Sequence, residues 1–261
     1  MNFQPIAVVK NIEVDPIFGP VGSLEVFNAW ESRLSVDHAK RFVADIASLA
    51  YGMEEARNHI GLFDKLLREG HLSCLEFVPE LRSQPMEGGP RIHLPEASLR
   101  TNKWLLAEPP GPWTWGEDFV KNQSENDPCF VVRVTCPLYV RSQWMRHRAA
   151  SYLEVSRRYT LGTENGRMPF AFYGPHEDPF VTAYWEMVLN EYNRRLDAGW
   201  PAQRARGCIP MEAMTTFYAG MFYTEWKESF FRLRCDGHAQ PEIRVMAEAL
   251  ASTLKVLEGL R

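Results

Sequence analysis

The chain has 261 residues, of which 45% are hydrophobic and 24% are charged, and its formal net charge is −4. This composition is typical of a globular protein with a sizeable core, and the length fits one large domain or two small ones. The acidic balance argues against broad non-specific binding to nucleic acid. No stretch approaches the roughly 20 apolar residues that span a membrane, so no membrane partner is expected.

Cysteine usage and the first residues both point to the cytoplasm. The cysteines are scattered, odd in number and free of CxxC pairs, which predicts reduced thiols rather than a disulfide frame or a zinc site. The opening residues, MNFQPIAVVKNIEVD, contain neither a basic stretch nor a long apolar run, so no signal peptide is expected. We therefore predict a cytoplasmic protein without a metal.

Strand and helix patterns alternate in the first part of the chain. β-Branched residues predict a strand over 4–15, and residues 22–34 fit either a second strand or a short helix. Helical periodicity covers 36–49 and 53–69, and the second helix stops at Gly70. Residues 71–77 form a loop or a short element.

Residues 78–128 have a different character, because they are rich in Pro, Gly and Trp and show weak periodicity. The segment is too long for a plain loop, which predicts an inserted subdomain within one domain spanning 1–261. Two interpretations stay open. The insertion is either a surface elaboration or a lid over a substrate, and Trp104, Trp113 and Trp115 favour the lid.

The second part of the chain begins with a strand pattern over 129–144, which Pro137 interrupts or ends. A helix is predicted to begin near Trp144 and to end near Ser151. A loop over 161–178 and helices over 179–198, 211–234 and 240–260 follow. Together these elements predict an α+β fold in which helices dominate.

Arginine is concentrated in RHRAASYLEVSRRY, residues 146–159, although the chain as a whole is acidic. The planar guanidinium group donates paired hydrogen bonds, so this density suits a phosphate ligand. Two other interpretations are an amphipathic helix whose arginines pair with surface carboxylates, and an RNA-binding module in which Tyr152 and Tyr159 stack on bases.

The order of residues in QWMRHRAASYLEVSRRY resembles the signature of the flavin-dependent thymidylate synthases. That signature is RHR, seven residues and Ser, with Gln three positions before it and Arg-Tyr after it. Four further segments resemble the family in the same order: GHLSCLEF, PCFVVRVTCPLYVRSQW, PAQRARGCIP and RLRCDGHAQPEIRVMA. Residues 78–128 stand as an insertion in this order.

The resemblance implies the fold of this family, with helices packed around a mixed or antiparallel sheet, and a homotetramer whose active sites are shared between subunits. It also implies reductive methylation of C5 of a uridine monophosphate, dUMP to dTMP. Methylenetetrahydrofolate would donate the carbon and FAD reduced by NADPH would supply the hydride. The protein's own part is binding, orientation and electrostatics.

Individual residues match the family's functional positions. Arg234 matches the arginine that polarises the uracil and favours loss of its N3 proton. The substrate-binding matches are Gln143, Arg146, Glu154, Val155, Ser156, Arg157, Arg158, Arg206 and Arg234, with Arg158 and Arg206 expected at the phosphate. The flavin-binding residues expected from the resemblance are His71, Ser73, Arg146, His147, Arg148, Glu154, Ser229 and His238.

Some positions depart from the family pattern. Leu153 and Phe77 stand where Asn and His are common, and Ser142 stands where an Arg often precedes the Gln. Tyr223, Glu225 and Ser229 stand where Asn, Arg and Asn often contact the adenosine end of FAD. The departures leave two alternatives open: a specialised UMP methylase of a nucleoside-antibiotic pathway, with relaxed dUMP/UMP specificity, and a scaffold without activity.

Overall fold

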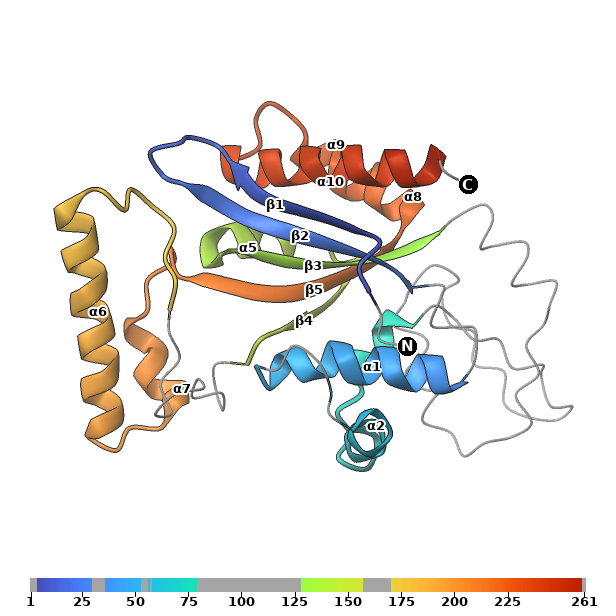
Figure 1. Ribbon diagram of the computed structural model, residues 1–261, viewed down its shortest axis with the longest axis horizontal. Coiled ribbons are helices and arrows are strands. Elements are labelled where there is room, and N and C mark those ends of the chain that lie inside the picture. The colour runs from blue at the N-terminus through green and yellow to red at the C-terminus, as the bar shows by residue number, and fades with distance from the viewer. Residues whose placement is uncertain are drawn as a thin grey trace, which may run out of the picture.

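A five-stranded antiparallel sheet forms the centre of the protein in a computed structural model that describes residues 4–29, 36–52, 56, 58–78, 128–156 and 170–259 (Figure 1). The strand order is β1-β2-β3-β5-β4. The strands are β1 (Ala7–Glu13), β2 (Pro20–Asn28), β3 (Cys129–Pro137), β4 (Ser151–Glu154) and β5 (Met214–Phe222). Most of the predicted insertion, residues 79–127, lies outside the described residues.

Helices lie on both faces of the sheet and at one end of it (Figure 1). One face carries α1 (Val36–Ala50), α2 (His59–Arg68) and the 3-10 helix η2 (Leu72–Phe77). The other carries α5 (Leu138–Trp144), α8 (Tyr223–Glu225), the π-helix η5 (Trp226–Phe231), α9 (Arg232–Arg234) and α10 (Pro241–Gly259). At the end lie α6 (Pro179–Asp197), α7 (Ala202–Ala205) and the 3-10 helix η4 (Arg206–Cys208).

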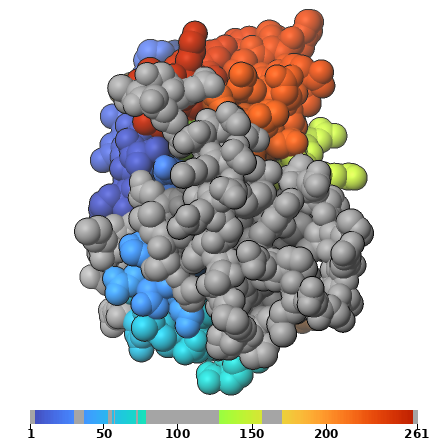
Figure 2. Space-filling model, turned by 90° about the vertical axis from the view of Figure 1, so that its right-hand side faces the viewer, coloured from blue at the N-terminus to red at the C-terminus, as the bar shows by residue number. Residues whose placement is uncertain are grey.

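The two helical layers are held to the sheet by the alternation of side chains along β3. Phe130, Val132 and Val134 pack toward α10, whereas Cys129 and Val131 pack toward α1. Successive side chains of a strand point to opposite faces of the sheet. Because the side chains of β3 are apolar on both faces, each face needs a layer of helices to bury them. In a view turned by 90°, the C-terminal helices and the α1–α2 layer accordingly lie at opposite ends of the molecule (Figure 2).

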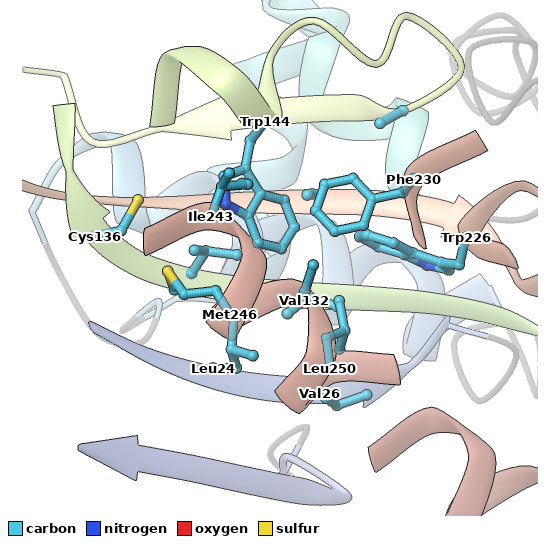
Figure 3. Close-up of a cluster of buried hydrophobic side chains, with 14 of the residues drawn as sticks. Leu24, Val26, Val132, Cys136, Trp144, Trp226, Phe230, Ile243, Met246 and Leu250 are labelled. Carbon is cyan, nitrogen blue, oxygen red and sulfur yellow. The ribbon is translucent and has the colours of Figure 1, made fainter. Parts of the chain in front are cut away.

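Large aromatic side chains pack together within the core between the sheet and α10 (Figure 3). The ring centroids of Trp144 and Phe230 are 4.3 Å apart, and those of Phe230 and Trp226 are 5.2 Å apart. Ile243 and Met246 of α10 close the cluster. Because large aromatic rings bury much apolar surface and pack in few orientations, they fix the end of α5 relative to η5.

Most predicted elements are confirmed. The strand over 4–15 and the helices over 36–49, 53–69, 179–198 and 240–260 correspond to β1, α1, α2, α6 and α10. Residues 22–28 fulfil the strand alternative in β2, residues 30–34 lie outside the described residues, and residues 72–77 form η2. Of the loop predicted over 161–178, residues 161–169 lie outside the described residues.

Two predicted helices are wrong. The helix near Trp144 ends there instead of beginning, because β3 stops at Pro137 and the chain turns at once into α5. Residues 211–234 contain a nine-residue strand, β5, before any helix. MTTFYAGMF contains two β-branched and three aromatic residues, which favour a strand, and it pairs with β3 from Met214 to Phe222.

Candidate functional site

Arg234, at the end of α9, is held in one orientation by two other parts of the chain. Its Nε donates to Nε2 of His147 at 2.9 Å. Its two terminal nitrogens donate at 3.1 Å each, Nη1 to the side-chain oxygen of Gln143 and Nη2 to the backbone oxygen of Gln143. A guanidinium group has five N–H donors, so one N–H on each terminal nitrogen is left over for a ligand.

His147 is buried, although it lies in the arginine-rich turn after α5. Burial, and next the positive charge of Arg234, lower the pKa of His147 to about 4, so the ring is neutral at pH 7. The ring of Phe230 lies 4.8 Å from that of His147, and Nδ1 of His147 lies 3.4 Å from Oγ of Ser229. The aromatic core therefore supports the residue that holds Arg234.

The π-helix η5 explains how the C-terminal segment reaches both the core and His147. Trp226 and Phe230 are fully buried, whereas Ser229 between them is half-buried and directs its hydroxyl at His147. π-Turns are rare and often occur at functional sites. Here the π-helix leads directly into α9, which carries Arg234.

Positive charge accumulates around this arrangement. Burial, and next the charge of Arg146, lower the pKa of Arg234. The side chains of Arg146 and Arg148 are exposed on either side of His147. Within the described residues neither forms an ion pair, so the cluster has an unbalanced charge that an anionic ligand can neutralise.

Glu154 lies close by on the edge strand β4 and is itself held on two sides. Its carboxylate accepts a hydrogen bond from Arg141 of α5 and one of 2.7 Å from the hydroxyl of Thr215 in β5. Tyr152, two residues earlier, donates its hydroxyl to the backbone oxygen of Trp144. These bonds tie β4 to the end of α5, on the same side of the sheet as Arg234.

The opposite side of β4 faces the α1 layer. Leu153 and Val155 pack against the buried cluster there, and η2 lies beside β4. Ser73 is in η2, and the exposed His71 precedes it, with Nδ1 3.9 Å from the carboxylate of Glu69. The backbone N–H of Ser156 donates to the backbone oxygen of Ala50 at 3.2 Å.

The structure thus brings together four predicted residues: Gln143, His147, Ser229 and Arg234. It does not join Arg206 to them, because Arg206 is exposed in η4, and η4 packs against α6 and α7 in what we call the α6–α7 lobe (residues 179–208). The exposed side chain of His238 pairs with Asp236 at 2.8 Å. Arg157 and Arg158 lie outside the described residues.

Sequence reasoning missed Arg141, Tyr152 and Thr215 as supports of the site. Arg141 lies two residues before Gln143, so its closeness in sequence to a predicted site residue could have indicated a supporting role. No feature of the sequence indicated Thr215, because its contact with Glu154 depends on the pairing of β4 with β5.

The described residues hold no group of three His, Cys, Asp or Glu side chains that could bind a metal ion. Among them, no helix has the length and apolar character needed to cross a bilayer.

Comparison with known proteins supports the interpretation of the arginine-rich segment. A family model described as "Thymidylate synthase complementing protein" matches residues 126–257. The flavin-dependent thymidylate synthase of Thermotoga neapolitana is 34% identical over 139 residues, which cover 48% of this chain and 61% of the relative. The enzyme of the same name from Thermus thermophilus is 32% identical over 147 residues, which cover 48% of this chain and 52% of the relative.

The chain therefore spans between half and two thirds of the length of these relatives. Among solved structures, a UMP/dUMP methylase PolB from Streptomyces cacaoi bound with 5-Br UMP is similar at 19% identity over 82% of this chain and 84% of that chain, with a TM-score of 0.40. The family model covers half of the chain, from β3 through α5, β4 and Arg234 into α10. The chain belongs to the thymidylate synthase complementing protein family, which comprises the flavin-dependent thymidylate synthases.

Proposed function

We propose that this protein transfers a one-carbon unit from methylenetetrahydrofolate to C5 of a uridine monophosphate and reduces it to a methyl group, with FAD reduced by NADPH as hydride source. The observation that carries the proposal is the guanidinium group of Arg234, held by Gln143 and His147 with two N–H groups left over. Relatives named flavin-dependent thymidylate synthase support the same chemistry.

Arg234 acts on the base. Two N–H groups on a fixed guanidinium can donate to a carbonyl oxygen of uracil, and the interaction strengthens as the ring loses its N3 proton and becomes an anion. Arg234 stays charged at pH 7 even though burial lowers its pKa. Because Gln143 and His147 orient the group before the ligand arrives, little reorganisation is needed during the reaction.

The phosphate of the nucleotide needs further cations. We assign it to Ser156, Arg158 and Arg206. The place of Arg206 on the α6–α7 lobe, without an ion pair among the described residues, suits a role toward a neighbouring copy of the chain. This arrangement is consistent with a homotetramer in which each active site takes residues from more than one subunit.

The residues around Arg234 also suit FAD. Arg146 and Arg148 are exposed cations without carboxylate partners in the described part of the chain, and a pyrophosphate would neutralise them through paired hydrogen bonds. His71 and Ser73, on the other side of β4, complete the group of residues assigned to the flavin with Glu154, Ser229 and His238. When bound, the flavin supplies hydride transfer.

The buried part of the arginine-rich segment counts against an RNA-binding module. His147, Ala150 and Ser151 are buried, so the described part of the segment, residues 146–156, does not present a continuous basic stripe. Two alternatives concern the same site instead. One is a specialised methylase of a nucleoside-antibiotic pathway that accepts UMP as well as dUMP, and the other is a scaffold that retains the fold without activity.

The decisive experiment offers labelled dUMP and UMP together to the purified protein with FAD, NADPH and methylenetetrahydrofolate. We expect a 5-methyl product that requires all three additions, and the ratio of the two products gives the sugar preference. Arg234→Ala should lower turnover by orders of magnitude. Arg232→Ala removes an exposed arginine from the same helix and is the matched control. If neither nucleotide is converted, the proposed activity is wrong and the protein is a scaffold without activity.

A further inference from the structure

We propose that His147 and Ser229 are positioning residues that set the orientation of the Arg234 guanidinium, and that they do so through the Nδ1-protonated tautomer of His147. The inference rests on the proposed function, because it assigns these two residues a role in the same site. It gives them a purpose other than the flavin contact that the sequence predicts.

The tautomer follows from the donor and acceptor roles of the three side chains. Arginine can only donate, so Nε2 of His147, 2.9 Å from Nε of Arg234, must be the acceptor and cannot carry a proton. The proton of the neutral ring then lies on Nδ1. Its partner is Oγ of Ser229 at 3.4 Å, which accepts it.

The surroundings favour the neutral ring. In the described part of the chain, Arg234 from α9 is the charged group that acts on His147, and Arg146 and Arg148 flank His147 in its own turn. Gln143 and Ser229 are uncharged, and no carboxylate contacts His147 within the described residues. A second proton on the ring would place a positive charge against Arg234 and remove the acceptor for its Nε.

The consequence for catalysis is geometric. Without the bond to His147, Arg234 keeps only Gln143, which contacts its two terminal nitrogens. The guanidinium plane can then tilt, and the two N–H groups aimed at the ligand lose their fixed direction. A displacement of about 1 Å at a reacting group can lower the rate by about 10²-fold.

The first test reads the tautomer directly, without any ligand. In protein labelled with ¹⁵N-histidine, two-bond ¹H–¹⁵N correlations at neutral pH should show His147 with its proton on Nδ1. Ser229→Ala should shift the Nδ1 signal, and Ser142→Ala should not, because the hydroxyl of Ser142 donates to the backbone oxygen of Leu138 in its own helix. A proton on Nε2 of His147 in the native protein would overturn the proposal.

The second test separates positioning from packing with two amides. In His147→Gln the amide oxygen can reach the place of Nε2 and accept from Arg234, whereas the shorter amide of His147→Asn lies near the place of Nδ1. We expect turnover to fall by about 10²-fold in His147→Asn and to recover most of that loss in His147→Gln. Ser229→Ala should lower turnover about fivefold, which corresponds to the loss of about 1 kcal/mol for one hydrogen bond.

The two tests distinguish a failure of the proposed function from a failure of the positioning role. If the native protein forms no methylated product but shows the Nδ1 tautomer, the proposed function is wrong and the geometric inference stands. If the native protein is active and His147→Asn and His147→Gln have equal turnover, the positioning role is wrong and the proposed function stands.

Discussion

The stability of the protein should depend on pH through His147, and His147→Gln provides the comparison. The pKa of His147 in the folded protein is lowered from 6.5 to about 4, first by burial and then by Arg234. The folded state keeps the ring neutral, while the unfolded chain takes up a proton as the pH falls below about 6.5. The stabilisation from His147 is therefore fully present above that pH and is lost progressively toward pH 4.

The size of the effect follows from the same two values. Each pH unit between 6.5 and about 4 lowers the free energy of unfolding by at most about 1.4 kcal/mol, so the upper bound of the total loss is about 3.5 kcal/mol. Glutamine does not titrate, so its variant lacks this component. Other ionisable groups contribute to both proteins and cancel in the difference.

Urea unfolding of the two proteins at a series of pH values from 7 to 4.5 measures this difference. Equal protein concentrations keep any effect of subunit association the same in both. The native protein should lose its stability advantage over His147→Gln, or fall further behind it, as the pH decreases. Two curves that stay parallel over this range would show that folding does not lower the pKa of His147, and the reasoning from its burial beside Arg234 would be refuted.

Three further predictions concern other parts of the chain. Arg234→Lys should lower turnover by at least about 10²-fold in a steady-state assay, because an ammonium group cannot bond to His147 and Gln143 and still present a fork to the ligand; turnover close to native would contradict the role of the guanidinium. If Arg206 and Arg234 serve one site from different subunits, inactive Arg206→Ala and Arg234→Ala subunits should regain part of the activity when they are refolded together, and a mixture that stays inactive would show that Arg206 does not serve the site of a neighbouring subunit. Alkylation of the folded protein followed by mass spectrometry should modify Cys208 well before Cys74, whose pKa burial raises to about 12, and equal labelling would show that Cys74 is accessible.

How far the sequence alone leads differs between the fold and the site. Long amphipathic helices such as α1 and α10 are visible in the sequence because a helix that covers a sheet needs one continuous apolar face. β5 is not, because its pairing with β3 involves residues some 80 positions apart in the sequence, such as Thr135 and Thr216. Long-range pairing of this kind overrides the local preference of a segment.

The site shows the same division. The resemblance located Gln143, His147, Ser229 and Arg234, and the structure brings all four together. The resemblance did not indicate how these residues contact one another. The contact between His147 and Ser229 depends on the π-helix, which changes the spacing of side chains along η5. The sequence predicted that both residues bind the flavin, whereas in the structure their side chains face each other.

Trp144 belongs both to the hydrophobic core and to the surroundings of the candidate site. Its ring packs on Phe230, while its backbone oxygen receives the hydroxyl of Tyr152 on the strand that carries Glu154. A change that loosens this one side chain therefore acts on folding and on ligand geometry together. Attempts to make the protein more heat-resistant by repacking around Trp144 should therefore also change the geometry of the candidate site, so such engineering is better directed at the outer surface of α10.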